Sequence, residues 1–330
     1  MKKQKLIFHV IGYSDVGLGH IYRSLALAKE LDEFQISFVC DQQSKEMTKL
    51  LVSGEYELHV IQSESTFDEI IGLNPDLLIN DILSTNEKDI IKIRNNNIKV
   101  VNFEDLGSGS KIADLTINEL YDKPKFEAPN IFWGHEYFFL RDEFLQREPN
   151  PFQQEIRNIL ITYGGTDSNN LTKQTFDHIS DLCILNDIFI YIVSGPGYQY
   201  YDELQAALYD IDNVHLTHST GVISDIMQKV QIAFTSNGRT VYELAHMNIP
   251  SIVISQHERE AEHAFSSKEN GMIHMGQYED TLTKGKILNE FKKMIENKDY
   301  FKSLHDKTSK LDFSENKKKV VEIIRSIAKG

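Results

Sequence analysis

The chain has 330 residues, of which 41% are hydrophobic and 25% are charged, the composition of an ordinary folded globular protein. This length exceeds what a single hydrophobic core usually serves, so we expect two domains. Asp and Glu number 49 against 35 Lys and Arg, and the formal net charge of -14 argues against general binding of nucleic acid or anionic lipid. A small phosphate-bearing ligand is still possible, because backbone N–H groups at a helix start attract anions locally.

The cysteines and the apolar runs bear on where the protein works. Cys40 and Cys183 lie in separate apolar runs without a nearby partner, which is typical of buried thiols in a reducing cytoplasm. The apolar run at residues 6–11 is too short for a signal peptide, and no run approaches the roughly 20 residues that cross a membrane. We therefore predict a cytoplasmic protein without an integral membrane segment.

In chain order, short runs rich in Ile, Val and Phe alternate with amphipathic stretches, the pattern of βαβ units and parallel sheets. Strands are predicted at residues 6–11, 36–40, 58–61, 77–80, 100–103 and 115–117, and the clearest helix between them at 20–31. A charged segment at 136–157 interrupts the alternation. Beyond it, strands are predicted at 159–162, 188–193, 214–216, 232–234 and 252–254, and helices at 170–182, 201–209, 240–247, 260–270 and 315–328. We predict domains at 1–150 and 151–330.

The first predicted strand runs into a glycine-containing turn. Gly17 and Gly19 precede the helix and allow a ligand to approach the backbone, and His20 opens the helix at the edge where α/β sheets bind ligands. The spacing matches neither the dinucleotide fingerprint nor a P-loop. The alternative is that His20 is merely a polar residue at a helix start.

A second turn follows the strand at 159–162. Gly164 and Gly165 allow a tight turn, and Thr166 and Asp167 add polar groups that could face an anion. The alternative is an ordinary turn in which Asp167, or one of the next two residues, caps the following helix.

A third turn follows the strand at 232–234, and it consists of Ser236, Asn237, Gly238, Arg239 and Thr240. Small residues at a helix start can hold a diphosphate, and Glu243, one turn into the helix, could accept hydrogen bonds from two ribose hydroxyls. The alternative is that Glu243 only complements the helix dipole.

No pattern favours a metal or another cofactor, and we predict neither. His257 and His263 are six residues apart, which places them on different helix faces and does not match a zinc motif. Asp210 and Asp212 imitate the acidic pair of some sugar transferases, but they directly precede a predicted strand.

Taken together, these segments resemble the PseG/SpsG family within the glycosyltransferase B (GT-B) architecture, and more distantly MurG. The resemblance spans nearly the whole chain and rests on residues 17–28, Asp81, 113–118, 134–141, 161–167, 236–244 and 248–251. It implies an α/β fold with two Rossmann-like domains that face each other across a cleft.

The resemblance also implies roles for individual residues. Domain 1–150 would carry the catalytic or acceptor side, with His20 matching the family's catalytic histidine and with Gly17, Gly19, Arg23 and Asp81 around the substrate. Domain 151–330 would bind the nucleotide-sugar through Gly164, Gly165, Thr166, Asp167, Ser236, Asn237, Gly238, Arg239, Thr240 and Glu243. After residue 254 the hydrolases usually carry an Asn–Gln pair, whereas this chain reads Ser-Gln-His-Glu-Arg at 255–259. Gln256 and His257 in this segment would face the cleft and contact the sugar, so the identity of the sugar and of the acceptor stays open.

The resulting hypothesis is a PseG-like hydrolase that cleaves the bond between the sugar and the phosphate of a UDP-sugar, in the biosynthesis of a bacterial surface glycan of the nonulosonic acid type. His20 would act as a general base on water. One alternative is a metal-independent inverting glycosyltransferase of the GT-B fold, and another is a non-catalytic module that binds nucleotide-sugars. The expected partner is a small UDP-sugar, not nucleic acid, and the oligomeric state stays open.

Overall fold

The structure is a computed structural model that describes residues 3–13, 16–52, 54–62, 65–219 and 223–329. The chain forms two compact units, Met1–Phe139 with Ser314–Gly330, and Leu140–Phe313. These units do not coincide with the predicted ranges 1–150 and 151–330, because the chain returns to the first unit for its last helix. How the function divides between the units stays a prediction.

The first unit is built on a seven-stranded parallel sheet with the strand order β3-β2-β1-β4-β5-β6-β7. Its strands are β1 (Lys5–Val10), β2 (Gln35–Cys40), β3 (Glu57–Val60), β4 (Leu77–Asp81), β5 (Lys99–Phe103), β6 (Leu115–Asn118) and β7 (Ile131–Trp133). Its helices are α1 (Gly19–Glu30), α2 (Lys45–Val52), α3 (Thr66–Gly72), α4 (Glu87–Arg94) and α13 (Asn316–Lys329), with the short 3-10 helices η1 (Ser108–Lys111) and η2 (His135–Tyr137).

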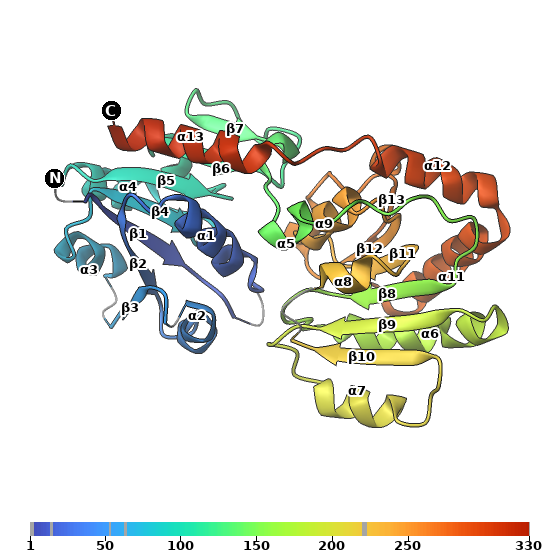
Figure 1. Ribbon diagram of the computed structural model, residues 1–330. Helices are drawn as coiled ribbons and strands as arrows, with labels where there is room; N and C mark the ends of the chain where they lie inside the picture. Colours follow the sequence, from blue (N-terminus) through green and yellow to red (C-terminus); the bar gives the residue numbers. More distant parts are fainter. Residues whose placement is uncertain (1–2, 14–15, 53, 63–64, 220–222, 330) are drawn as a thin grey trace. The chain divides into compact units, whose positions relative to one another are not determined.

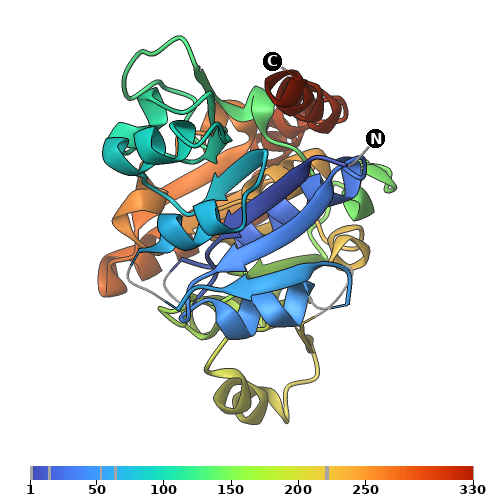
Figure 2. The same cartoon turned by 90° about the vertical axis from the view of Figure 1, so that its left-hand side faces the viewer.

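Alternating side chains of these strands fill two hydrophobic layers, one on each face of the sheet, as expected for a parallel sheet covered on both sides. On β1, Leu6 and Phe8 belong to one buried cluster, whereas Ile7 belongs to the other. Helix α13 contributes Val320 and Ile324 to the cluster that contains Leu6 and Phe8. Figures 1 and 2 show α13 lying along this unit, and Gln4, just before β1, donates a hydrogen bond to the Ala328 carbonyl near its end.

The second unit contains a six-stranded parallel sheet with the order β10-β9-β8-β11-β12-β13. Its strands are β8 (Asn158–Thr162), β9 (Phe189–Ser194), β10 (Val214–His218), β11 (Ile232–Thr235), β12 (Ser251–Ser255) and β13 (Met272–Gln277). Its helices are α5 (Asp142–Leu145), α6 (Leu171–Leu185), α7 (Tyr201–Leu208), α8 (Ser224–Met227), α9 (Thr240–His246), α10 (Glu258–Ala261), α11 (Asp280–Glu296) and α12 (Lys298–Thr308), with η3 (Lys268–Asn270).

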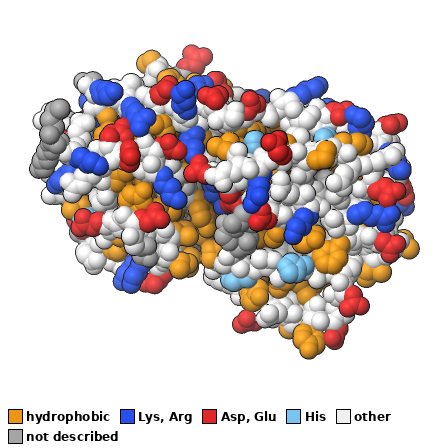
Figure 3. Space-filling model, viewed as in Figure 1, with side chains coloured by type: hydrophobic (Ala, Val, Ile, Leu, Met, Phe, Trp, Pro, Cys, Tyr) orange, Lys and Arg blue, Asp and Glu red, His pale blue; other side chains and the backbone are white. Residues whose placement is uncertain are grey.

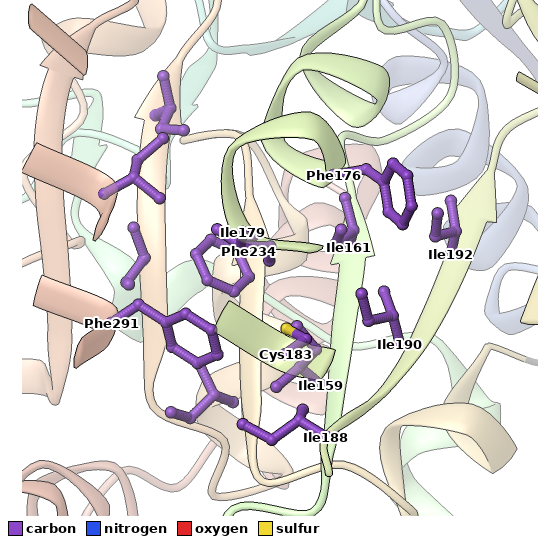
Figure 4. Packing of buried hydrophobic residues seen from close by; sticks show 14 of the residues in the cluster. Ile159, Ile161, Phe176, Ile179, Cys183, Ile188, Ile190, Ile192, Phe234 and Phe291 are labelled. Atoms are coloured by element: carbon purple, nitrogen blue, oxygen red, sulfur yellow. The ribbon is translucent and has the colours of Figure 1, made fainter. Parts of the chain in front are cut away.

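Isoleucines and aromatic rings dominate the core of this unit (Figure 4). Ile161 of β8 and Ile192 of β9 lie in the same buried cluster as Phe176 of α6. The rings of Phe234 in β11 and Phe291 in α11 pack edge to face, with their centres 5.2 Å apart. Both cysteines are buried free thiols, as predicted.

The two sheets share one topology, since the first strand of each unit lies in the middle and the strand order reverses beside it. In such doubly wound sheets ligands bind outside the carboxyl ends of the strands at this reversal, which falls between β1 and β4 and between β8 and β11. The prediction of an α/β chain with two Rossmann-like parallel sheets is confirmed.

Two differences from the predicted elements concern local structure. The helix predicted at 260–270 is wrong: α10 covers only Glu258–Ala261, and the chain continues irregularly to η3 (Lys268–Asn270). The side chain of Asn237 binds the carbonyls of Glu260 and His263, which draws this segment away from a helical path. The strands β7 and β13 were not predicted.

The surface carries mixed charge. On the face shown in Figure 3, Lys and Arg side chains are interspersed with Asp and Glu. Within the described part of the chain, no helix is both long enough and apolar enough to cross a membrane.

Candidate active site

The turn after β1 places His20 at the start of α1. Gly17 adopts a φ of +82°, which a residue with a Cβ rarely tolerates, and its N–H donates to the Tyr13 carbonyl at 2.9 Å. Helix α1 then begins at Gly19, so His20 occupies its first turn. Residues 14 and 15 of this turn lie outside the described residues.

His20 forms a buried pair with Asp81, the last residue of the neighbouring strand β4. The two residues are 6% and 0% exposed, and His20 Nδ1 lies 2.5 Å from Asp81 Oδ1. Burial alone would raise the pKa of Asp81, but the positive charge of Arg23 and the bond from His20 outweigh it and hold that pKa below its usual range. Since an ionised carboxylate only accepts hydrogen bonds, Nδ1 carries the hydrogen of a neutral His20. Nε2 has no partner among the described residues, so its lone pair is available to a ligand.

Arg23, one turn further along α1, locks Asp81 in place. Its Nε donates to Asp81 Oδ2 at 2.7 Å, and its Nη2 contacts Oδ1 of the same carboxylate. Its Nη1 donates to Glu104 Oε1 and to Glu119 Oε1, each at 2.7 Å. Burial alone would lower the pKa of Arg23, but the three carboxylates raise it well above its usual value, so the guanidinium stays charged. Its central carbon also lies 4.8 Å from the centre of the Phe103 ring.

Glu104 and Glu119 were missed by the sequence analysis. Each directly follows a strand, β5 and β6 respectively. Because β4, β5 and β6 are parallel neighbours, both residues lie at the carboxyl ends of the strands, as Asp81 does. Glu104 has a φ of +53°, an unusual backbone state for a non-glycine residue that often marks functional sites. The signal in the sequence was an acidic residue immediately after each apolar run.

Arg23 and Asp81 were predicted to contact substrate. Their side chains have no exposed surface, and the contacts described above join them to each other, to His20 and to the two glutamates. These contacts position His20, and direct contact of Arg23 or Asp81 with a substrate stays a prediction.

In the second unit, the turn after β8 fits closely against the turn after β9. Gly164 has a φ of +81°, and a Cβ on Gly195 would come within 2.4 Å of Gly165. Asp167 accepts hydrogen bonds from the N–H groups of Leu171 and Thr172, both at 2.8 Å, so its carboxylate satisfies two donors at the start of α6, whose N-cap residue is Asn170. Thr166 is buried. Ligand contacts of these residues stay predictions.

The turn after β11 has an inner and an outer part. Ser236 and Asn237 are buried, and Asn237 Nδ2 donates to the Glu260 and His263 carbonyls at 2.7 and 3.0 Å. Asn237 therefore organises the segment that follows β12. The outer part, Gly238, Arg239 and Thr240, is only partly buried and leads into α9.

Glu243 is held by a side chain that was not among the predicted site residues. It is 8% exposed, and its Oε1 accepts a hydrogen bond from Arg141 Nε at 3.0 Å. Arg141 in turn pairs with Glu143 at 2.7 Å and lies over the Phe144 ring. The carboxylate of Glu243 is thus positioned by Arg141, and its contact with a ribose stays a prediction.

Gln256 and His257 follow β12, and this segment contacts the turns that follow the neighbouring strands. Gln256 Nε2 donates to the Tyr163 carbonyl at 3.1 Å, and the Gln256 carbonyl accepts from Asn169 at 2.7 Å. His257 Nδ1 accepts from the Glu260 N–H at 3.3 Å, which caps α10. The structure therefore brings the turns after β8, β11 and β12 together.

The residues weighed for metal binding lie elsewhere. Asp210 and Asp212 are exposed and precede β10, so they are at the opposite edge from the carboxyl ends of the strands. Across the described ranges, no three or more His, Cys, Asp or Glu side chains are grouped so that they could hold a metal ion.

Comparison with known sequences shows which proteins this chain is similar to. No family model matches. An uncharacterized protein of Methanocaldococcus jannaschii is 30% identical over 76% of this chain, and the match spans about half of that relative's length, 55%. The spore coat polysaccharide biosynthesis protein SpsG of Bacillus subtilis is 25% identical over 80% of this chain and 81% of its own. The UDP-2,4-diacetamido-2,4,6-trideoxy-beta-L-altropyranose hydrolase of Campylobacter jejuni is 29% identical over 52% of this chain and 64% of its own.

The predicted resemblance to the PseG/SpsG family is confirmed. Solved structures agree on the fold. MurG of Acinetobacter baumannii aligns with 98% of this chain and 99% of its own, with a TM-score of 0.65 and 15% identity. The UDP-GlcNAc 2-epimerase of Neisseria meningitidis, solved with UDP-GlcNAc, covers 97% of this chain and 100% of its own, with a TM-score of 0.65 and 14% identity. The GT-B prediction for the fold is confirmed.

Proposed function

We propose that the protein is an enzyme of nucleotide-sugar metabolism that hydrolyses the bond between the sugar and the diphosphate of a UDP-sugar, without a metal. The observation that carries this proposal is the geometry of His20. Its Nδ1 is fixed on Asp81 at 2.5 Å, while its Nε2 has no partner among the described residues. A neutral imidazole held in this tautomer is suited to take a proton from water.

In the proposed reaction, His20 Nε2 removes a proton from a water molecule as the water oxygen bonds to the anomeric carbon. The bond between that carbon and the phosphate oxygen breaks, and its electron pair leaves with UDP. The buried Asp81 carboxylate stabilises the imidazolium that forms, and Arg23 holds Asp81 in position. The second unit would bind the diphosphate of the nucleotide through residues 236–240 and its ribose through Glu243.

The named relatives support the substrate class. The Campylobacter relative is named as a hydrolase of a UDP-diacetamido-trideoxy sugar, and the Bacillus relative is named for spore coat polysaccharide biosynthesis. By analogy, we place this protein in the biosynthesis of a bacterial surface glycan of the nonulosonic acid type. Two buried free thiols, Cys40 and Cys183, suit a reducing cytoplasm.

The test is a panel of UDP- and CMP-sugars incubated with the protein in water enriched in oxygen-18, with EDTA present and with or without candidate acceptors. The proposal expects UDP release that needs no acceptor, and heavy oxygen in the free sugar. Heavy oxygen in UDP would instead show that the bond between the bridging oxygen and phosphorus is cleaved. Release that requires an acceptor hydroxyl would favour a transferase that uses the same histidine, and a loss of turnover restored by magnesium would contradict the metal-free mechanism.

A further inference from the structure

Glu260, in the short helix α10 (Glu258–Ala261), reaches the turn that is proposed to hold the diphosphate. Its Oε2 accepts a hydrogen bond from the Gln256 N–H at 2.9 Å. The Asn237 backbone and the Ser236 hydroxyl favour the ionised form of the same carboxylate and so lower its pKa. A Cβ built on Gly238 would lie 3.4 Å from Glu260 Oε1, so the carboxylate lies against the backbone of this turn.

The backbone of Glu260 is tied to the same turn, which keeps the side chain there. Asn237 Nδ2 donates to the Glu260 carbonyl at 2.7 Å, and the Glu260 N–H donates to His257 Nδ1. Three residues further on, the His263 ring bonds the Asn237 carbonyl at 2.7 Å. A movement of Glu260 away from the turn would therefore break several bonds at once.

A carboxylate at this position conflicts with an anionic ligand. Both use the same N–H and hydroxyl donors, and like charges in a partly buried site repel. Resting on the proposed function, we propose that Glu260 binds the nucleotide diphosphate in its protonated form, and that its carboxyl O–H donates a hydrogen bond to a phosphate oxygen. Binding of the nucleotide then takes up one proton from solution.

The electrostatics of the turn fit this assignment. Burial raises the pKa of Glu260 to about 7, and the negative charge of Asp167 adds to the increase, while bonds from Gln256, Asn237 and Ser236 oppose it. Two histidines, His257 and His263, are bonded to Glu260 or Asn237, and Arg239 follows Gly238 in the chain. A proton on Glu260 is therefore accessible near neutral pH, and a phosphate close by makes it more favourable.

The test uses UDP and the full-length chain at pH 8, where the phosphates of free UDP are ionised. Calorimetry in two buffers with different ionisation heats gives the number of protons taken up on binding. On binding UDP, the wild type should take up close to one proton more than Glu260→Gln does. As the pH rises above 7, the UDP affinity of the wild type should fall, relative to that of the variant, by up to about tenfold per pH unit. Glu258→Gln, an exposed neighbour in the same helix, should behave like the wild type.

The opposite results are equally specific. Equal proton uptake in the wild type and in Glu260→Gln would overturn the proposal. A larger proton release by the wild type than by Glu260→Gln near pH 6 would overturn it too, because it would show that Glu260 loses its proton when UDP binds. If UDP binds and depends on Glu243 but not on the protonation of Glu260, only this inference fails. If UDP does not bind to any of the three proteins, the proposed function fails with it.

Discussion

At the scale of single residues, the distinctive feature is a histidine whose two ring nitrogens have different surroundings. Nδ1 of His20 is committed to Asp81, and Nε2 is left for a ligand. Arg23 binds the Asp81 carboxylate, and the carboxylates of Glu104 and Glu119 compensate the charge of Arg23. A buried arginine without such partners would be costly, so the carboxylates stabilise the arrangement as well as orient it.

The sequence identified part of this arrangement. His20 was recognisable from its position after Gly17 and Gly19, and Asp81 from the family resemblance. Glu104 and Glu119 were not, because an acidic residue after a strand is common. Only the strand order shows that three such residues converge on one guanidinium. The bond between Arg141 and Glu243 joins residues 102 positions apart and could not be inferred from spacing.

Glu243 gives a prediction for nucleotide binding. As the proposed ribose ligand, its replacement in Glu243→Ala should weaken UDP by roughly 1.5 to 3 kcal/mol, about ten- to a hundredfold, because charge-assisted hydrogen bonds are lost. Isothermal titration measures the change. The matched control is Glu143→Gln, which alters the other partner of Arg141 and should leave UDP affinity within a few fold. An unchanged affinity in Glu243→Ala would remove the ribose assignment.

At the scale of elements, both sheets place their site residues at the carboxyl ends of the central strands. The strands of these sheets were largely predictable, because buried parallel strands are continuous apolar runs. β7 escaped prediction because it has only three residues, and β13 because it includes polar residues and Gly276 and its pairing with β12 shifts register. The helix predicted at 260–270 failed because Asn237, far away in sequence, binds that segment.

The pairing of β1 with β4 also predicts a pH dependence of stability. His9 of β1 lies beside Asn80 of β4 and bonds its Oδ1 at 3.2 Å, and burial lowers the pKa of His9 to about 4. The folded state therefore keeps His9 neutral, while the unfolded chain binds a proton below the ordinary histidine pKa of about 6.5. Stability should be full above that value and fall as the pH drops toward 4, by about 2 kcal/mol at pH 5 from this residue alone.

Chemical denaturation of the wild type and of His9→Gln at pH 5 and 7.5 checks this. The variant should be less stable at both values but should lose less stability between them than the wild type does. Because His246 and His274 also have pKa values lowered by burial, the contribution of His9 is taken from this difference. His215→Gln, which changes an exposed histidine, should keep the full acid sensitivity. Equal losses in the wild type and in His9→Gln would show that His9 does not govern this effect.

At the scale of the whole molecule, the chain does not divide into two consecutive halves. Its last helix, α13, belongs to the first unit and buries Val320, Val321 and Ile324 there. An amphipathic pattern predicted that this helix exists, but not which core it joins, because a periodic apolar face fits any core of suitable shape. Arg325 bonds Glu33 at 2.7 Å, a contact across 292 residues that no local signal indicates.

The placement of α13 predicts a separation of stability from nucleotide binding. Ile324→Ala removes a fully buried side chain from the first unit and should destabilise it by about 2 to 5 kcal/mol. UDP affinity, measured well below the unfolding temperature, should stay unchanged, because the proposed nucleotide residues lie in the second unit. Glu322→Ala, at an exposed position of α13, serves as the control for thermal unfolding. A Tm of Ile324→Ala equal to that of the control would contradict the packing of α13.

The most direct measurement of the central claim compares the pH dependence of turnover in the wild type and in His20→Asn on the UDP-sugar that the panel identifies. The wild type should lose rate on the acidic side as the imidazole takes up a proton, because a protonated base cannot accept the proton of water. His20→Asn should turn over about 10² to 10⁴ times more slowly, lack this acidic limb and bind UDP with wild-type affinity. Near-normal turnover in His20→Asn, or an acidic limb that persists in it, would contradict the assignment of His20 as the base.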